Sequence, residues 1–456
     1  MIYFPSNIYF IGIGGIGMSA LARYFKTRKC CVCGYDRTET ALTQALCREG
    51  IGVHYRDDVN AIPPSFRNSP DDTLVIYTPA VPASHVELNW FKEHRYRLIK
   101  RAEALGVLSK EKKTVAVAGT HGKTSVSAMT AFLLTEAGAG CDAFLGGISK
   151  NYHTNLLLRE GSEYLVAEAD EYDRSFLHLH PCVAVVTAMD ADHLDIYGTH
   201  AEMKAAFRQF TAQIQPGGVL LAKYGLELSA PKGVRQYSYS LTHPQADYYA
   251  EAVHVTGGRY AADVRTPQGV LKNVQFGIPG LVNVENGIAA IAAAALTGVP
   301  PEKAASSMTR FEGVERRFDC RVKNDRLIYI DDYAHHPEEL RFTVESVRQL
   351  YPGRHITGVF QPHLYTRTRD FAEGFAQSLS LLDSLILLDI YPAREDPIPG
   401  VDAQIIFDRV TIPDKKMCRK EEVIEILKTR RLDVLLTMGA GDIDTLVKPL
   451  ENLLKT

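Results

Sequence analysis

The stretch from residue 114 to residue 126, Thr-Val-Ala-Val-Ala-Gly-Thr-His-Gly-Lys-Thr-Ser-Val, constrains the fold more than any other part of the chain. A short apolar run rich in β-branched residues precedes two glycines, a lysine and two hydroxyl residues, and a helical pattern follows. This order predicts a strand, a tight turn and a helix N-terminus, where unpaired N–H groups and the helix dipole favour an anion. We therefore expect an α/β domain with a phosphate-binding loop.

The side chains of this loop are suited to a nucleotide. Lys123 can reach β- and γ-phosphates, and the Thr124 hydroxyl can ligate Mg²⁺. The usual spacing G-x-x-x-x-G-K-[ST] is not met, because Val117 stands five residues before Gly122, and Gly119 makes a shorter loop. A strand–turn–helix junction with a chance lysine is the alternative. Two glycines, a lysine and two hydroxyls in this order favour phosphate binding.

Length and composition limit the possible classes of protein. A chain of 456 residues is too long for one core and indicates two to four domains. A net charge of −3 argues against a nucleic-acid partner held by backbone electrostatics. The longest stretch of low polarity, residues 287–299, is too short to span a bilayer, so no membrane insertion is expected.

The N-terminus and the cysteines predict a reduced, cytoplasmic location. The first residues lack a basic leader and a small-residue cleavage site. Eight cysteines in a chain of this length do not indicate a disulfide scaffold. Cys30 and Cys33 form a C-x-x-C by position, but they lie in a strand pattern with Cys31 on the same face as Cys33, so buried residues are favoured over a zinc site.

Residues 1–107 read as a Rossmann-like domain of alternating strands and helices. A strand at 7–13 leads into the motif Gly12-Ile-Gly-Gly-Ile-Gly17 and a helix, and a second strand at 30–35 ends at Asp36. Asp36 lies about 20 residues beyond the motif, which completes the dinucleotide fingerprint. In this fingerprint the glycines admit a pyrophosphate and the acid takes a ribose hydroxyl. The residues leave open which diphosphate binds.

Residues 108–315 form the predicted central domain, of the P-loop type. A strand at 164–168 runs into a group of acids, and a strand at 181–187 is followed by another. The first group comprises Glu168, Asp170, Glu171 and Asp173, and the second comprises Asp190, Asp192 and Asp195 with His193 among them. Two neighbouring strands that end in acids predict Mg²⁺ ligands at one sheet edge, with Glu168 the favoured ligand and His193 a weaker one. Short strand patterns over 217–280 predict a small extra β-sheet.

Residues 316–456 repeat the α/β pattern and predict a second Rossmann-like domain. Polar residues follow its strand ends, where open α/β sheets bind ligands. The pair His335-His336 could be metal ligands, but a helix-start or substrate role is favoured because adjacent side chains point in different directions. Arg367 and Arg369, beside Tyr365, are at least as well suited to clamp a carboxylate or phosphate as to lie in solvent.

Several motifs, in this order, resemble those of the Mur ligases, the ATP-dependent amino-acid ligases of peptidoglycan synthesis. They are Gly12-Ile-Gly-Gly-Ile-Gly-Met-Ser19, Gly119-Thr-His-Gly-Lys-Thr124, Glu168-Ala-Asp-Glu171, Asp192-His193, Arg316-Arg-Phe-Asp319, Asp331-Asp-Tyr-Ala-His-His-Pro337 and Phe360-Gln-Pro-His-Leu-Tyr-Thr-Arg-Thr-Arg-Asp370. The resemblance covers the whole chain. The His-His-Pro and Gln-Pro-His stretches are similar to those of the alanine-adding member and of the ligase that recycles muropeptides, and the Gly-Gly-Ile-Gly turn favours the former.

The resemblance implies three α/β domains and assigns ligands to them. UDP-N-acetylmuramate is assigned to Gly12, Gly14, Gly15, Gly17, Met18, Ser19, Asp36, Gly146, Gly147 and Asn155. ATP is assigned to Gly119, Thr120, His121, Gly122, Lys123, Thr124, Ser125, Asn283, Asn286, Arg317 and Asp332. L-alanine is assigned to Tyr365, Arg367, Arg369 and His336, catalysis to Lys123, Glu168 and His193, and Mg²⁺ to Thr124, Glu168 and His193.

The implied reaction joins L-alanine to the lactyl carboxylate of UDP-N-acetylmuramate through an acyl phosphate, with ATP as the phosphate donor. Several sister ligases use a carbamylated lysine, and Phe207 falls at that position, so no such lysine is expected. The recycling ligase, which adds a tripeptide, is the alternative within the family. An NAD(P)-dependent dehydrogenase and a non-enzymatic nucleotide-binding regulator are alternatives from other classes. The sequence does not distinguish a monomer from a dimer.

Overall fold

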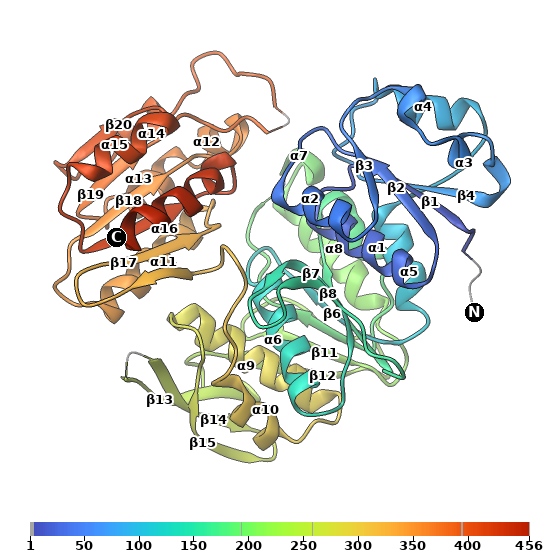
Figure 1. Cartoon of the computed structure of the whole chain (residues 1–456). Coiled ribbons are helices and arrows are strands. Elements are labelled where there is room, and N and C mark those ends of the chain that lie inside the picture. Colours follow the sequence, from blue (N-terminus) through green and yellow to red (C-terminus); the bar gives the residue numbers. More distant parts are fainter. Residues whose placement is uncertain (1–3, 193, 258, 394, 456) are drawn as a thin grey trace. The chain divides into compact units, whose positions relative to one another are not determined.

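The computed structural model describes residues 4–192, 194–257, 259–393 and 395–455. Contacts divide the chain into two compact units. The first comprises Met1–Glu251, Asp263–Val274 and Asn286–Met308, and the second comprises Ala252–Ala262, Gln275–Glu285 and Thr309–Thr456. Three sheets, each mostly parallel, give the α/β architecture that the strand and helix patterns predict (Figure 1).

Five parallel strands form the first sheet, in the order β3-β2-β1-β4-β5. They are β1 (Asn7–Ile11), β2 (Cys31–Tyr35), β3 (Gly52–His54), β4 (Thr73–Tyr77) and β5 (Arg97–Lys100), with helices α1 (Ile16–Thr27), α2 (Ala41–Arg48), α4 (Val86–Glu93) and α5 (Arg101–Ser109). The strand order reverses at β1, because β2 and β4 lie on its two sides. Parallel sheets bind ligands at the carboxyl end of the strand where the order reverses.

Strand β1 ends at Ile11, before the predicted end at residue 13, because Gly12 turns the chain. Gly12 has a φ of 86°, a conformation that glycine adopts without strain. The N–H groups of Gly12 and Ile13 both donate to Tyr35 O, at 2.8 and 3.0 Å. The glycine turn therefore lies across the carboxyl ends of β1 and β2.

The central sheet has ten strands, in the order β15-β14-β13-β12-β11-β10-β6-β9-β7-β8. Those around the phosphate loop are β6 (Lys113–Ala118), β7 (Asp142–Ser149), β8 (Thr154–Leu157), β9 (Tyr164–Ala169), β10 (Val183–Val186) and β11 (Val219–Lys223). Strand β6 pairs in parallel with β9 on one side and β10 on the other. The carboxyl ends of these three strands therefore lie at one edge, as the acid-rich strand ends predict.

The strands of residues 217–280 extend the central sheet, which corrects the prediction of a small extra sheet. These strands are β12 (Arg235–Ser240), β13 (Tyr248–Thr256), β14 (Arg259–Thr266) and β15 (Gly269–Gln275). Strand β12 pairs with β11 along five residues and with β13 through only Tyr239↔Tyr248 and Ser240↔Tyr249. A strand edge is open to further pairing, and this short ladder is enough to make the sheet continuous.

The third sheet has six strands, in the order β16-β17-β21-β18-β19-β20. They are β16 (Asp319–Lys323), β17 (Ile328–Asp332), β18 (Ile356–Phe360), β19 (Ser384–Leu387), β20 (Lys415–Met417) and β21 (Val434–Met438). All pairs except β16–β17 are parallel. Adjacent residues of β17 enter separate apolar clusters, with Ile330 on one face and Tyr329 on the other. This burial of both faces is typical of a parallel sheet covered by helices on both sides.

An apolar cluster in the first unit joins the first sheet to the central one. It contains Phe25 of α1 and Leu105 of α5 together with Phe144 of β7 and Phe207 of α8 (His200–Ala212). Phe207 is fully buried and packs edge-to-face on Phe176, with ring centroids 5.2 Å apart. The position that sister ligases give to a carbamylated lysine is therefore a core position in this chain.

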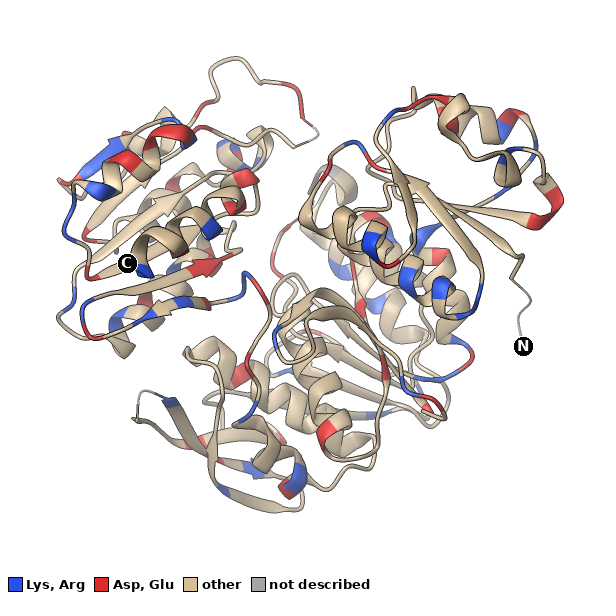
Figure 2. Cartoon of the chain, in the orientation of Figure 1, with Lys and Arg blue, Asp and Glu red and all other residues tan. Residues whose placement is uncertain are grey.

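The charged residues and the cysteines are distributed as the near-neutral net charge and the number of cysteines predict. Lys and Arg are interspersed with Asp and Glu on the helices and loops (Figure 2). All eight cysteines are free, and Cys33 is buried, as predicted, whereas Cys31 is exposed because it starts its strand. Among the described residues, helices long and apolar enough to cross a membrane are absent.

Candidate active site

The phosphate loop connects β6 to α6 (Lys123–Glu136) and has a shape that requires glycine. Gly119 has a φ of 135°, and a Cβ on it would lie 2.1 Å from Thr187 Oγ1, just beyond β10. The first turn of α6 contains no acidic residue, and its N-cap makes no side-chain hydrogen bond. The shortened spacing therefore packs the loop against β10, and the N-cap of α6 supplies no side-chain acceptor that would compete with an anion.

Lys123 is held in place by two acceptors. Its Nζ donates to Gly119 O at 2.7 Å and to Glu171 Oε1 at 2.8 Å. Burial opposes the charge, but the carboxylates of Glu171, Asp170 and Glu168 raise the pKa of Lys123 above its ordinary value, so it is cationic. Burial raises the pKa of Glu171 to about 7, although Lys123 lowers it. Glu171 was predicted only as one of the strand-end acids, and its contact with Lys123 gives it a separate place in the phosphate loop.

Glu168 lies near the end of β9, opposite Val117 of β6. A Cβ on Gly146 would lie 1.9 Å from Glu168 Oε2, so the carboxylate lies against the backbone of β7. Glu168 Oε2 is buried without a hydrogen-bond partner among the described residues. A buried carboxylate oxygen without a partner needs an explanation, and an oxygen-loving cation at this edge supplies one.

Thr124 and His193 are the other two predicted Mg²⁺ ligands. Thr124 is buried in the first turn of α6, and His193 lies outside the described residues. Within the described ranges, groups of three or more His, Cys, Asp and Glu side chains arranged to hold a metal are absent. The site that these residues can offer Mg²⁺ thus consists of one carboxylate and one hydroxyl, and phosphate oxygens would complete it.

The remaining predicted nucleotide residues of the first unit surround the loop. Thr120 Oγ1 accepts a hydrogen bond from Asp190 N at 3.1 Å, and His121 Nε2 lies 3.6 Å from Asp190 Oδ2. Ser125 is buried in α6. Asn286, on α9 (Leu281–Leu296), places its Oδ1 2.9 Å from where a Cβ on Gly122 would be. These contacts place Asp190, which follows β10, and Asn286 of α9 against the loop.

Asp36 supports the glycine turn of the first sheet. Its Oδ2 accepts from Gly14 N at 2.7 Å, and its Oδ1 accepts from Thr38 N at 3.1 Å. Ser19 Oγ, one turn into α1, donates to Ile16 O at 2.9 Å. The acid predicted to face a ribose therefore also fixes the shape of the turn on which a diphosphate would lie.

Asn155 of β8 ties α1 to the central sheet. Its Nδ2 donates to Ile16 O at 2.6 Å and to Ser19 Oγ at 3.0 Å, and its Oδ1 accepts from Arg23 at 2.6 Å. Arg23 also pairs with Glu49 through two contacts of 2.7 Å. Asn155 was predicted to lie near the sugar. Its described contacts are those of a residue that positions the diphosphate helix.

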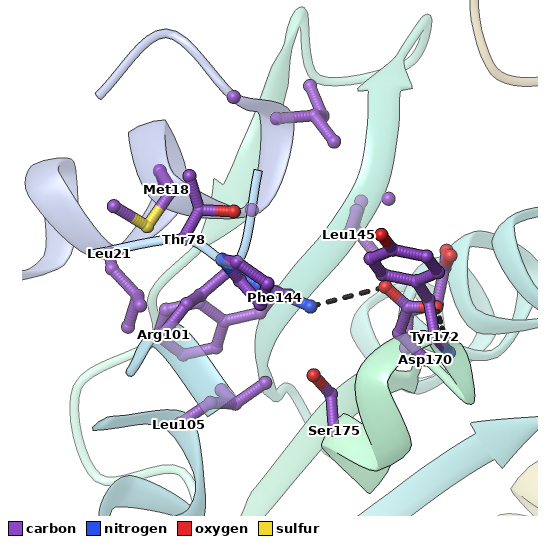
Figure 3. Close-up of a pocket in the computed structure, with 16 residues that line it drawn as sticks. Met18, Leu21, Thr78, Arg101, Leu105, Phe144, Leu145, Asp170, Tyr172 and Ser175 are labelled. Atoms are coloured by element: carbon purple, nitrogen blue, oxygen red, sulfur yellow. Dashed lines mark hydrogen bonds and ion pairs between the residues drawn. The ribbon is translucent and has the colours of Figure 1, made fainter. Parts of the chain in front are cut away.

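A cavity of about 240 Å³ lies between the glycine turn and the acid-rich strand end (Figure 3). It brings together Gly15, Gly17 and Met18 of the first sheet with Gly146 and Glu168 of the central one. These residues come from three separate stretches of sequence, of which the first two were assigned to UDP-N-acetylmuramate and the third, with Glu168, to catalysis and Mg²⁺. Gly147, the neighbour of Gly146 on β7, is not among the lining residues.

In the second unit, Asp332 and His336 support the start of α11 (Pro337–Leu350). Asp332 Oδ2 accepts from Thr343 Oγ1 at 2.6 Å, and burial raises its pKa to about 6, although this hydrogen bond lowers it. His336 caps α11 and accepts from Glu338 N at 3.4 Å, which confirms the predicted helix-start position. Arg317 stacks over the Tyr333 ring, 4.8 Å from its centroid. Asn283, also in this unit, donates to Pro279 O at 2.6 Å.

The two arginines predicted as an anion clamp differ in their surroundings. Tyr365, Arg367 and Arg369 lie on a short helix, α12 (Tyr365–Asp370), and not on a loop. Side chains two positions apart on a helix do not face each other. Arg367 is 7% exposed, whereas the Arg369 side chain is 52% exposed and pairs with Asp370 at 2.7 Å. Arg367 is therefore the buried member of the pair, and the role of both arginines at an anion stays a prediction.

The comparisons with known proteins agree with this geometry. Three family models match in chain order: Mur ligase family, catalytic domain, over residues 7–113; Mur ligase middle domain, over 117–294; and Mur ligase, glutamate ligase domain, over 316–441. UDP-N-acetylmuramate–L-alanine ligases of Parabacteroides distasonis and Phocaeicola vulgatus are 52% and 50% identical over 98% of this chain, and the matches cover 97% and 98% of those proteins. The chain belongs to the Mur ligase family.

Solved structures share the architecture of this Mur ligase. UDP-N-acetylmuramate-alanine ligase MurC from Thermotoga maritima has a TM-score of 0.84 and 26% identity, covering 98% of this chain and 99% of that one. A murein peptide ligase from Psychrobacter arcticus has a TM-score of 0.71 and 19% identity over 98% of this chain, and it shares the fold. The three-domain α/β fold is therefore confirmed, and the exact boundaries at 107/108 and 315/316 stay predictions.

Aromatic residues beyond the predicted set gather in the second unit of this Mur ligase. The rings of His335 and His363 lie 6.1 Å apart, and His363 stacks on Tyr391 at 5.8 Å. Tyr333 packs edge-to-face on His335 at 5.3 Å. Each of these residues follows the end of a strand in the third sheet, a position that the sequence could have identified. Which of them lie close together depends on the order of the strands in the sheet.

Proposed function

We propose that this protein is the ATP-dependent ligase that joins L-alanine to UDP-N-acetylmuramate, giving UDP-N-acetylmuramoyl-L-alanine, ADP and phosphate in peptidoglycan synthesis. The observation that carries the proposal is the cavity in which the diphosphate turn and Glu168 line one space. Curated relatives of that name at about half identity support it over the full chain. The eight free thiols support the predicted cytoplasmic location.

In the proposed first step, the lactyl carboxylate attacks the γ-phosphate of ATP and forms an acyl phosphate, with ADP leaving. A carboxylate that approaches a polyanion is repelled, so positive groups at the γ-phosphate dominate the catalysis. Lys123 supplies such a charge at the start of α6, and Glu171 and Gly119 O hold its ammonium there. Thr124 and Glu168 would hold Mg²⁺, which neutralises charge on phosphate oxygens when it is bound.

In the proposed second step, the amine of L-alanine attacks the acyl carbonyl and phosphate leaves. The buried Arg367 is the best candidate for the alanine carboxylate, because a guanidinium donates two parallel hydrogen bonds to a carboxylate. Tyr365, Arg369 and His336 stay predicted neighbours of the amino acid.

Phosphate release from ATP with Mg²⁺ and UDP-N-acetylmuramate tests this function. We expect release that depends on L-alanine, with less on glycine or L-serine and none on the tripeptide that a recycling ligase adds. A Lys123→Met enzyme and a reaction without UDP-N-acetylmuramate are the controls. Tripeptide-dependent release would favour the recycling ligase, and no release with any acceptor would overturn the ligase proposal.

A further inference from the structure

Arg101 is the only basic residue among the described residues that line the cavity (Figure 3). It is the first residue of α5, and none of the motifs singled out in the sequence contains it. The other charged residues of the lining are Glu168 and Asp170, both acidic. Without Arg101 the side chains of this cavity would repel any anionic ligand.

The guanidinium of Arg101 lies between the glycine turn and the acid-rich strand end. A Cβ on Gly17 would be 2.8 Å from Arg101 Nη1, so the guanidinium covers the start of α1. On its other side Arg101 Nη2 lies 3.2 Å from Asp170 Oδ2. Asp170 is itself held, because its Oδ1 accepts from Tyr172 N at 3.1 Å.

Helix α5 is fixed closely enough to keep Arg101 in this place. A Cβ on Gly106 would lie 2.6 Å from His178 O, so the helix backbone approaches the segment that follows the strand-end acids. Ala104 and Leu105 of the same helix are buried in the apolar cluster that the first and central sheets share. The start of α5, and with it Arg101, is therefore held in place by the packing of α5 against both neighbouring segments.

The ligand in the proposed function has a diphosphate that must lie in this region. The N–H groups at the N-terminus of α1, such as that of Gly17, can donate to it, but they carry only partial charge. A guanidinium presents a rigid fork of donors that matches phosphate oxygens and keeps its charge at every physiological pH. Arg101 places such a guanidinium at the start of α1.

We infer that Arg101 binds the diphosphate of the UDP-sugar substrate against the glycine turn, while Asp170 positions its guanidinium. This inference rests on the proposed function, because it takes the cavity to be the site of a UDP-sugar. It makes Arg101 a binding residue and Asp170 a positioning residue. The bound diphosphate shares the guanidinium with Asp170.

Binding of UDP and of uridine by the full-length enzyme, measured by calorimetry, tests the inference without any catalytic step. Arg101→Met should weaken UDP binding by roughly 10- to 100-fold, because a hydrogen bond to a charged group is lost. Uridine, which has no diphosphate, should bind both enzymes equally. Arg101→Lys should bind UDP with an intermediate loss, because a lysine keeps the charge but not the fork.

Lys100→Met is the matched control. Lys100 is the neighbouring residue and pairs with Asp173 of the same segment at 2.8 Å, but it does not line the cavity. We expect it to bind UDP as the wild type does. Asp170→Asn should raise the KM for UDP-N-acetylmuramate several-fold and raise the KM for ATP less, which a general loss of structure would not do.

Wild-type affinity for UDP in Arg101→Met would overturn the inference, as would equal losses for UDP and uridine. If Arg101→Met does not fold, Arg101→Lys decides, since wild-type UDP affinity in that variant would exclude forked donation. A wild-type enzyme that binds UDP but releases no phosphate would refute the ligase proposal alone. An active wild type whose Arg101→Met variant binds UDP normally would refute the Arg101 inference alone.

Discussion

Replacing Lys123 with methionine separates the chemistry of the phosphate loop from its packing. The lysine side chain is 13% exposed, and its ammonium pairs with Glu171, which is fully buried. Methionine keeps an unbranched apolar stem and removes the charge. A change in turnover then reports on the contact with the γ-phosphate, and a change in stability reports on the ion pair.

The two effects have different expected sizes. Loss of one preorganised donor to developing charge lowers kcat by about 10²–10³-fold. Removing one partner of a buried ion pair costs about 3–5 kcal/mol. Because burial already raises the pKa of Glu171 to about 7, its carboxyl can take up a proton in the variant. We therefore expect the free energy of unfolding to fall by the lower end of this range, about 3 kcal/mol.

The pH dependence has a definite sign. Without Lys123 the pKa of Glu171 in the folded state lies further above its ordinary value of 4.5, so the folded variant binds more protons than the unfolded chain. The stability of the variant is then greatest at low pH and falls as pH rises towards that pKa. Its deficit in melting temperature against the wild type should be larger at pH 8 than at pH 6.

The assay combines phosphate release with thermal unfolding at the two pH values. The double variant Lys123→Met/Glu171→Gln is the control, and it should regain most of the lost stability while its turnover stays as low as that of the single variant. Turnover of Lys123→Met within about 10-fold of the wild type would refute the role at the γ-phosphate. A double variant no more stable than the single one would refute the ion-pair account.

Three other changes have expected outcomes. Asn155→Ala should raise the KM for UDP-N-acetylmuramate about 10-fold, because α1 loses its hydrogen bonds with Asn155, and leave the KM for ATP unchanged; equal rises in steady-state kinetics would contradict this. Gly119→Ala should abolish ATP turnover because its Cβ meets Thr187, whereas Gly138→Ala, where nothing lies within 4 Å of the Cβ, should stay active. Burial raises the pKa of Glu87, an acceptor for Tyr9, from 4.5 to about 7. As pH rises through that window, the wild type should therefore lose about 3 kcal/mol more stability than Glu87→Gln, and parallel melting curves of the two proteins from pH 4.5 to 8 would refute this.

Local sequence was sufficient for most elements and for both glycine turns. The strand predicted at 164–168 is β9 (Tyr164–Ala169), and the helix predicted from residue 126 is α6, which begins at Lys123. Such patterns succeed because side-chain periodicity and glycine placement act within one element. The region 217–280 shows the limit, since its strands were identifiable but their attachment to β11 was not.

Pairings across long stretches of sequence required the tertiary structure. The pattern of residues 361–369 indicated a loop with two arginines, but the chain forms a short helix there that sends them in different directions. The ion pair of Lys123 with Glu171 joins residues 48 positions apart. No periodicity encodes such a contact, because it depends on which strands become neighbours.

By itself, the sequence determined that the chain builds parallel α/β sheets, that one turn suits a diphosphate and that another suits a nucleotide phosphate. These properties arise from glycines, hydroxyls and a lysine at neighbouring positions. The tertiary structure alone decided that Arg101 lies over Gly17, that Glu171 holds Lys123 and that Asn155 ties α1 to β8. The physical reason is that a cavity forms where strand ends and helices from distant segments pack together, and packing, not local pattern, sets which charges meet in it.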